Sequence, residues 1–268
     1  MRVSLVVTTY ERPEALAAVL ATVAAQGRMP EEVLVADDGS GPATLDAVRR
    51  FAARVRTPVA YIRQQHEGFR VARLRNLAAA ASRGDYLVFI DGDMLLHADF
   101  IADHAAAARR GAFVQGVRIP LDDDATRVAL AAPADPAGPR GAVGLRRLYG
   151  WRRPALARAC ARLANGFVAV KSCNFALWRD DLVAVNGFDE AFVGWGPEDK
   201  DLAARLRHLG RARRTLVFGG IAWHLHHAPA ARDRHAANQA LFARTRAQRA
   251  VRCPLGLDAH ATNPAAWL

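Results

Sequence analysis

The sequence predicts an α/β protein built on a mainly parallel, Rossmann-like sheet with helices on both faces. Strand-like and helix-like segments alternate through the first hundred residues, which is typical of parallel sheets. The strand-like segments are apolar along their whole length, as in Leu87-Val88-Phe89-Ile90, and this fits strands that are buried on both faces. We expect one folded unit, because 268 residues suffice for one large α/β domain.

The expected elements of the first half follow one another with short connections. Pro13 is a good first-turn residue, so it predicts the start of the first helix. The expected strands are 3–8, 32–36, 59–63 and 86–90, and the expected helices are 14–25, 43–55 and 71–81.

The second half has weaker signals. We expect in order a helix over 99–109, a strand over 113–119, a loop-like segment over 121–144, a basic amphipathic stretch over 145–163, a helix over 199–209, a strand over 215–218, and a helical tail from residue 230 that ends loosely. The Arg-rich and Leu-rich stretch 145–163 either packs on the domain or lies on an anionic membrane surface, and the sequence leaves both open.

Polar clusters follow three of the expected strands. They are Thr8-Thr9-Tyr10, Asp37-Asp38 and Asp91-Gly92-Asp93. In open α/β sheets ligands bind beyond the carboxyl ends of the strands, so these clusters should meet at one edge of the sheet. The carboxylates of the Asp-x-Asp triplet can hold a hard divalent cation, and that cation can bridge a diphosphate. An acidic turn with no ligand is the alternative for each cluster taken singly.

Two further clusters carry candidate chemistry. Gly194-Trp195-Gly196-Pro197-Glu198-Asp199 places an indole beside two carboxylates, an arrangement that can grip a sugar ring while a base removes a proton from its hydroxyl. Helix capping is the alternative for the two acids. Three histidines within four residues, His224, His226 and His227, suggest that at least one binds a metal.

Composition sets limits on partners and compartment. The net charge of +11 attracts anions in general and does not choose among nucleic acid, lipid surfaces and phosphorylated substrates. Cys160, Cys173 and Cys253 have no metal-like spacing, so we expect free buried thiols in a reducing compartment. We find neither a secretory signal nor ~18 consecutive apolar residues, and we expect a cytoplasmic protein, with peripheral contact at the inner face of the plasma membrane as the open alternative.

Taken together, these motifs resemble family 2 glycosyltransferases of the GT-A type. The resemblance spans roughly residues 3 to 227 in the family's order, and it rests on Val6 to Pro13, Asp37-Asp38-Gly39-Ser40, Gly68-Phe69-Arg70 with Arg75-Asn76, Gly84-Asp85-Tyr86 before the Asp-x-Asp triplet, and Asn186-Gly187-Phe188-Asp189 through Asp199. The Gly-Trp-Gly-x-Glu-Asp segment is similar to the galactosyltransferase-type acceptor half of chondroitin-polymerase-like bacterial enzymes and β-1,4-galactosyltransferases.

The resemblance implies roles for the donor-binding residues. Thr8, Tyr10 and Asp38 match residues that hold the uridine part of the donor, with Asp38 facing the base. Arg75 matches an arginine that approaches the nucleotide, and Asp91 matches a carboxylate near the ribose.

It also implies the metal, catalytic and acceptor-binding residues. Asp93 matches the aspartate that binds Mn²⁺ or Mg²⁺, and His224 is the expected histidine ligand, although the assignment can shift to His226 or His227. The remaining matches are Asp199 as catalytic base, and Trp195, Glu198 and Asn174 as acceptor-binding residues.

The implied function is an inverting, metal-dependent hexosyltransferase. Its donor would be UDP-hexose or UDP-N-acetylhexosamine, and its acceptor a saccharide or lipid-linked saccharide in bacterial cell-surface polysaccharide or lipopolysaccharide synthesis. We expect a nucleotide-sugar-binding half over 1–110, an acceptor-binding and catalytic half over 111–229, and a helical tail over 230–268.

Two other function classes compete with this one. A nucleotide-sugar-processing nucleotidyltransferase would be expected to have a Gly-rich phosphate loop, and the sequence has none. A non-catalytic nucleotide-binding or nucleic-acid-binding protein would exploit the positive charge, but the intact acidic site argues against nucleic acid as a partner.

Overall fold

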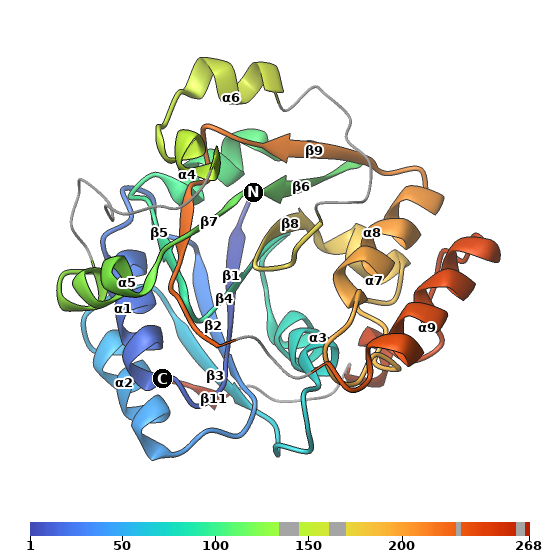
Figure 1. Ribbon diagram of the computed structural model, residues 1–268, viewed down its shortest axis with the longest axis horizontal. Helices are drawn as coiled ribbons and strands as arrows, with labels where there is room; N and C mark the ends of the chain where they lie inside the picture. Colours follow the sequence, from blue (N-terminus) through green and yellow to red (C-terminus); the bar gives the residue numbers. More distant parts are fainter. Residues whose placement is uncertain (134–144, 161–169, 229–231, 261–265) are drawn as a thin grey trace.

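The computed structural model of the protein describes residues 1–133, 145–160, 170–228, 232–260 and 266–268 (Figure 1). Its centre is an eight-stranded sheet in the order β11-β3-β2-β1-β4-β8-β6-β9. These strands are β1 (Val3–Thr9), β2 (Glu32–Asp37), β3 (Val59–Arg63), β4 (Tyr86–Asp91), β6 (Ala112–Gly116), β8 (Asn174–Trp178), β9 (Ala212–Leu216) and β11 (Ala266–Trp267). All run in one direction except β8 and β11, which confirms a mostly parallel sheet.

Helices cover both faces of this sheet (Figure 1). They are α1 (Pro13–Ala24), α2 (Pro42–Ala52), α3 (Val71–Ala81), α4 (Phe100–Ala107), α5 (Asp123–Ala131), α6 (Pro154–Cys160), α7 (Arg179–Ala184), α8 (Glu198–His208) and α9 (His235–Ala247). Alternate residues of β4 enter opposite cores: Val88 packs with residues of α1 and α2, whereas Phe89 packs with residues of α3 and α8. Burial on both faces explains why these strands have no polar face.

A second sheet of three strands lies beside the first, and its strand order is β5-β10-β7. Its strands are β5 (Met94–Leu96), β7 (Arg118–Pro120) and β10 (Ala222–His224). Strand β10 pairs antiparallel with β5 and parallel with β7, so residues far apart in the chain meet directly after β4.

The structure confirms the four strands and three helices expected in the first half and corrects several expectations in the second. The expected strand 113–119 is two strands, β6 and β7, because β6 pairs with β8 and β9 while β7 pairs with β10. The expected strand 215–218 lies earlier, as β9, and ends before Phe218, whose φ is 58°. The tail ends in β11, which pairs with β3.

The segment 121–144 is not loop-like throughout, because α5 begins within it. Asp122 accepts a hydrogen bond from the backbone N–H of Ala125 at 2.8 Å, so the acidic run caps a helix. The rest of that expectation, 134–144, lies outside the described residues.

The stretch expected to be amphipathic is a 3₁₀ helix, Leu145–Gly150, followed by α6, and residues 161–163 lie outside the described part. One side packs on the domain: Tyr149 meets Phe218 edge-on, and Arg152 donates to Asp103 at 2.8 Å. Trp151 is 67% exposed on the other side. In the described residues, no helix combines the length and apolar composition that crossing a bilayer requires.

Candidate functional site

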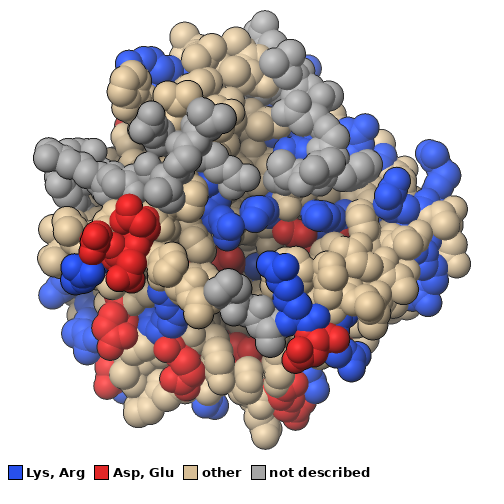
Figure 2. All heavy atoms as spheres, in the orientation of Figure 1, with Lys and Arg blue, Asp and Glu red and all other residues tan. Residues whose placement is uncertain are grey.

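A cavity of about 790 Å³ opens at the carboxyl ends of β1, β2 and β4. The register of the parallel strands aligns Thr8 with Asp91, so the polar clusters expected at the strand ends do meet at one edge. Figure 2 shows a hollow in this face, with Lys and Arg side chains around it and carboxylates inside it. Ten of the predicted site residues line the cavity: Thr8, Tyr10, Asp38, Arg75, Asp91, Asp93, Trp195, Glu198, Asp199 and His224.

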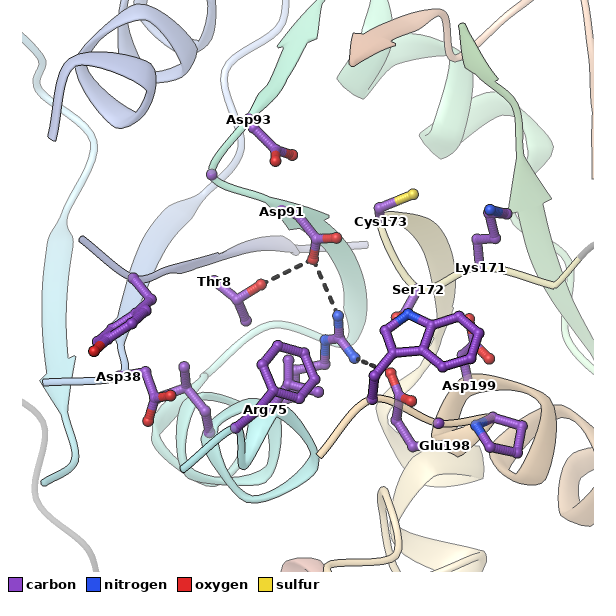
Figure 3. Close-up of a pocket in the computed structure, with 18 of the residues that line it drawn as sticks. Thr8, Asp38, Arg75, Asp91, Asp93, Lys171, Ser172, Cys173, Glu198 and Asp199 are labelled. Atoms are coloured by element: carbon purple, nitrogen blue, oxygen red, sulfur yellow. Dashed lines mark hydrogen bonds and ion pairs between the residues drawn. The ribbon is translucent and has the colours of Figure 1, made fainter. Parts of the chain in front are cut away.

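The Asp-x-Asp turn is fixed by a close approach to β1. The Gly92 N–H donates to the Thr8 carbonyl oxygen at 2.7 Å, and a Cβ at Gly92 would lie 3.0 Å from that oxygen. Only glycine fits this approach without a shift. The Thr8 hydroxyl donates to Asp91 Oδ1 at 2.9 Å, which orients the first carboxylate of the turn (Figure 3).

Arg75 links the two sides of the cavity. Its buried guanidinium donates to Asp91 Oδ1 at 3.0 Å and to Glu198 Oε1 at 3.1 Å, as Figure 3 shows. Burial alone would lower the pKa of Arg75, but Asp91 and Glu198 raise it above its ordinary value. The guanidinium therefore fixes the end of β4 against the start of α8.

The turn after β2 separates a structural carboxylate from an accessible one. Asp37 is fully buried and accepts hydrogen bonds from Ser40 and from the Tyr61 hydroxyl. Asp38 lines the cavity. Its Oδ1 accepts a hydrogen bond from the Gln64 side-chain amide, and its Oδ2 lies 3.1 Å from the Nδ1 of His66.

An aromatic platform lies next to Asp38. The rings of Tyr10 and His66 stack with centroids 4.3 Å apart and planes 10° apart. Tyr10 is 44% exposed and lines the cavity, so a flat group bound beside it would have a stacking partner and a hydrogen-bond acceptor.

The side chains of Asp93, His224 and His227 form a candidate metal site in the same cavity. Asp93 Oδ2 lies 3.5 Å from His224 Nε2 and 3.3 Å from His227 Nε2, and the two imidazole nitrogens are 3.2 Å apart. His226 is turned away: its backbone N–H donates to Thr126, and its ring lies 3.7 Å from Asp123.

The electrostatics of this cluster suit a cation. Burial lowers the pKa of His224 to about 3, so its imidazole is neutral and can ligate a metal at neutral pH. Burial, with repulsion from Asp91, raises the pKa of Asp93 to about 6. Within the described part of the chain, the buried Oδ1 of Asp93 has no hydrogen-bond partner. A divalent ion would satisfy that oxygen, so these residues fit a metal.

Backbone pairing holds the metal cluster together. His224 is opposite Met94 in the β5–β10 ladder, and the Leu225 N–H donates to the Asp93 carbonyl oxygen at 3.0 Å. The ligands therefore stand side by side although 130 residues of chain separate them.

The facing wall carries the acids at the start of α8. Asp199 Oδ1 accepts a hydrogen bond from the backbone N–H of Lys200 at 2.7 Å. Burial raises the pKa of Asp199 to about 6, and burial together with the charge of Asp199 raises the pKa of Glu198 to about 8. A carboxylate with a pKa near neutral that faces a cavity is a candidate general base.

Trp195 lies at the mouth of the cavity and is 36% exposed. The guanidinium of Arg232 lies 4.7 Å from its ring centroid, and the His235 ring lies 4.9 Å away. The tail and the start of α9 therefore help to build this wall.

The structure corrects the expectation that Asn174 contacts a sugar. Its side chain is fully buried: the amide oxygen Oδ1 accepts a hydrogen bond from His104 Nε2, and the amide nitrogen Nδ2 donates to the carbonyl oxygens of Val117 and Gly220. These bonds join the two sheets, so Asn174 has a structural position and does not line the cavity.

Several cavity residues had no local sequence signal. Lys171, Ser172 and Cys173 precede β8, and Arg118 comes from β7. The three cysteines form no disulfide, and burial raises the pKa of Cys173 to about 12, so its thiol stays protonated. The pairing of β7 with β10 and of β8 with β4 brings these residues to the cavity.

Comparison with known sequences gives consistent matches. A profile described as "Glycosyl transferase family 2" matches residues 4–179, and one described as "N-terminal domain of galactosyltransferase" matches residues 157–227. The validoxylamine A glucosyltransferase of Streptomyces hygroscopicus subsp. limoneus is 32% identical over 220 residues, which are 77% of this chain and 48% of that protein. The chondroitin synthase of Escherichia coli is 28% identical over 240 residues, 82% of this chain and 34% of that protein.

The chain thus spans about half the length, or less, of these relatives. Among solved structures, S. aureus TarS 1-349 in complex with UDP-GlcNAc superposes with a TM-score of 0.62 at 14% identity, covering 97% of this chain and 69% of that one. The mannosyltransferase PcManGT from Pyrobaculum calidifontis, in complex with GDP-Man and Mn²⁺, gives a TM-score of 0.60 at 20% identity, covering 84% of this chain and 56% of that one. The two superpositions support a GT-A fold.

Proposed function

The chain belongs to glycosyl transferase family 2, and from that premise we propose that it transfers a hexose from a nucleotide donor to a saccharide hydroxyl with inversion of configuration. The observation that carries the proposal is the placement of the metal cluster and Asp199 on facing walls of one cavity. One wall suits a leaving diphosphate and the other an attacking hydroxyl. The donor half is 1–110, and the acceptor half is 111–229, to which the tail 230–268 adds Arg232 and His235.

The donor we propose is a UDP-hexose or UDP-N-acetylhexosamine. Tyr10 offers its ring to the base, and Asp38 offers a carboxylate oxygen to the imide N–H of uracil. We infer that Asp91 accepts hydrogen bonds from the ribose hydroxyls, and the bonds by which Thr8 and Arg75 orient its carboxylate support this role. The UDP-GlcNAc in the TarS structure supports uracil as the base.

Asp93, His224 and His227 are the residues that would hold a divalent cation, Mn²⁺ or Mg²⁺. This adds His227 to the pair expected from the sequence. Two imidazoles and one carboxylate favour Mn²⁺ over Mg²⁺, and the PcManGT complex supports that choice. When bound, the cation stabilises the negative charge that gathers on the departing diphosphate.

Asp199 is the proposed base of a single displacement. It takes the proton of the acceptor hydroxyl while that oxygen bonds to the anomeric carbon. The bond from the anomeric carbon to the phosphate oxygen breaks on the opposite side, and the nucleoside diphosphate leaves. Glu198, which Arg75 holds in place, and Trp195 position the acceptor ring.

The acceptor we propose is a saccharide or lipid-linked saccharide in bacterial cell-surface polysaccharide or lipopolysaccharide synthesis. A cytoplasmic location with peripheral membrane contact would suit a lipid-linked acceptor. The exposed Trp151, with the guanidinium of Arg153 lying 5.7 Å from its ring centroid, supports such contact. Co-sedimentation with anionic liposomes tests it, with Trp151→Ser as the variant that should lose binding.

A donor-hydrolysis screen tests the proposed reaction. UDP-sugars, GDP-sugars and other nucleotide sugars are incubated with Mn²⁺ or Mg²⁺, and release of the free sugar is followed. We expect turnover of at least one UDP-sugar only with a divalent ion, and its loss in Asp93→Ala. Nucleotide binding that is steeply salt-dependent, needs no divalent ion and leads to no sugar release would refute the proposal in favour of a non-catalytic binding protein.

A further inference from the structure

Helix α9 holds the loop 193–197, which carries Trp195. The side chain of Asn238, on α9, is buried against this loop with 1% of its surface exposed. Its Nδ2 donates to the carbonyl oxygen of Val193 at 3.0 Å and to that of Trp195 at 3.1 Å, and the carbonyl oxygen of Gly194 lies 3.5 Å away. A side-chain amide has two N–H donors, so the loop uses both of them.

The glycines on either side of Trp195 allow α9 to approach the loop this closely. A Cβ at Gly196 would lie 2.6 Å from the Nδ2 of Asn238, and a Cβ at Gly194 would lie 2.8 Å from the Cγ of Arg234. Gly194 also has a φ of 78°, a conformation that favours glycine. The packing of the loop on α9 therefore explains why the sequence reads Gly-Trp-Gly at this point.

The loop 193–197 connects three parts of the cavity wall. The Gly194 N–H donates to the carbonyl oxygen of Phe69 at 2.8 Å, and Phe69 lines the cavity. The loop then runs directly into α8, whose first two residues are Glu198 and Asp199. Loss of the Asn238 amide would thus shift Trp195 relative to Asp199, and a displacement of about 1 Å between groups that hold a substrate is costly.

We propose that Asn238 is a positioning residue for the acceptor, because its amide sets where Trp195 presents its ring to the saccharide that Asp199 deprotonates. The inference rests on the proposed function. Neither family profile reaches Asn238, since their matches end at residues 179 and 227. Acceptor affinity should therefore depend on a helix outside the profile-matched part of the chain, whereas donor affinity should not.

Hydrogen exchange measures whether Asn238 holds the loop. Asn238→Asp keeps the size of the side chain and replaces its N–H donors with an oxygen, which the loop carbonyl oxygens repel. Gln248→Glu makes the same change from amide to acid on an exposed residue at the end of α9 and serves as the matched control. We expect the backbone amides of 193–196 to exchange about tenfold faster in Asn238→Asp and at the wild-type rate in the control.

Transfer kinetics measure whether the loop sets acceptor binding. The acceptor probe is the methyl glycoside or disaccharide that the wild type glycosylates fastest, and the donor is the UDP-sugar found in the hydrolysis screen. In Asn238→Asp we expect the KM for this probe to rise about tenfold and the KM for the UDP-sugar to change less than twofold. In a Trp195→Ala background the same substitution should raise the acceptor KM less than twofold, because Asn238 acts through Trp195.

Thermal melting shows which variants are folded, and Asn238→Ala, which removes the donors without adding a charge, replaces Asn238→Asp in both measurements if the latter does not fold. A folded variant whose loop exchanges at the wild-type rate would overturn the inference and leave the proposed function standing. A lower kcat with an unchanged acceptor KM would also overturn it, since that result indicates only a smaller active fraction. The exchange measurement needs no acceptor, so it decides whatever the probes do. A wild type that releases sugar from no donor would instead remove the proposed function, and the acceptor role of Asn238 with it.

Discussion

The Asp199→Asn substitution should make the protein inactive and at the same time more stable at neutral pH. Burial raises the pKa of Asp199 from its ordinary value of 3.8 to about 6, so the folded state binds this proton more tightly than the unfolded state does. Above pH 6 the ionised carboxylate therefore destabilises the folded state. A shift of about 2 pKa units corresponds to at most ~3 kcal/mol.

The pH dependence gives the sign of the effect. Below about pH 4 both states carry a protonated carboxyl, so the aspartate imposes no such penalty there. The loss of folding stability caused by the ionised carboxylate grows between about pH 4 and pH 6, and it stays constant above pH 6. Asparagine has no charge to desolvate, and its oxygen can still accept the Lys200 N–H. We expect Tm to rise by ~2 °C for each kcal/mol at pH 7.5, and the gain to vanish near pH 4.

Three measurements on one variant check this reasoning. Differential scanning calorimetry at pH 7.5 and pH 4 gives the stability change, and Asp46→Asn on the exposed surface of α2 is the matched control that should change nothing. Calorimetric titration with UDP and Mn²⁺ should give wild-type affinity. The rate of product formation should fall by a factor of about 10² to 10⁴, which is the usual contribution of a general base. A lower Tm at pH 7.5 would refute the destabilisation by the buried carboxylate. Turnover near that of the wild type would refute Asp199 as the catalytic base.

Three further outcomes follow from the site. His227→Ala should weaken Mn²⁺ binding at least tenfold in the presence of UDP, whereas His226→Ala should not, and equal losses in equilibrium dialysis would contradict the ligand set. Arg75→Gln should lower the free energy of unfolding by about 3 to 5 kcal/mol, because it leaves two partly or fully buried carboxylates facing each other, whereas Arg28→Gln should cost less than about 1 kcal/mol in urea unfolding. Turnover should fall about tenfold per pH unit below pH 6 as Asp199 becomes protonated, and a flat profile between pH 5 and 7 would exclude it as the base.

The first half of the fold could be predicted from the sequence because its signals are local. The strands are apolar throughout, and Pro13 and Pro42 mark helix starts, so periodicity and turn residues suffice. The site residues at the strand ends followed from the same reasoning, since parallel strands bring their carboxyl ends to one edge.

The second half depends on pairing that no local pattern reports. Strands β5 and β10 have only three residues each, and β10 finds its partners across more than a hundred residues of chain. Asn174 shows the same limit for a single residue. The family resemblance predicted a sugar contact for it, but its side chain is buried against His104.

The choice among the three histidines also needed the structure. In a regular strand His224 and His226 would share a face, so alternation would pair them. Strand β10 ends at His224, and the chain beyond it turns so that His227 returns to the cavity while His226 is held at Thr126. The end of a strand, which sequence patterns place poorly, decides the ligand set.

The β5–β10 ladder fixes where the proposed metal would lie without fixing which ion it is. Peptide groups hold Asp93 beside His224, so the frame does not depend on which side chains extend from it. Ligand types can then be exchanged with the backbone unchanged. A change such as His227→Asp would replace a nitrogen donor by oxygen and shift the ion preference from Mn²⁺ toward Mg²⁺. In evolution or in engineering, such a scaffold can adapt to the ion its surroundings supply while the donor and acceptor walls remain as they are.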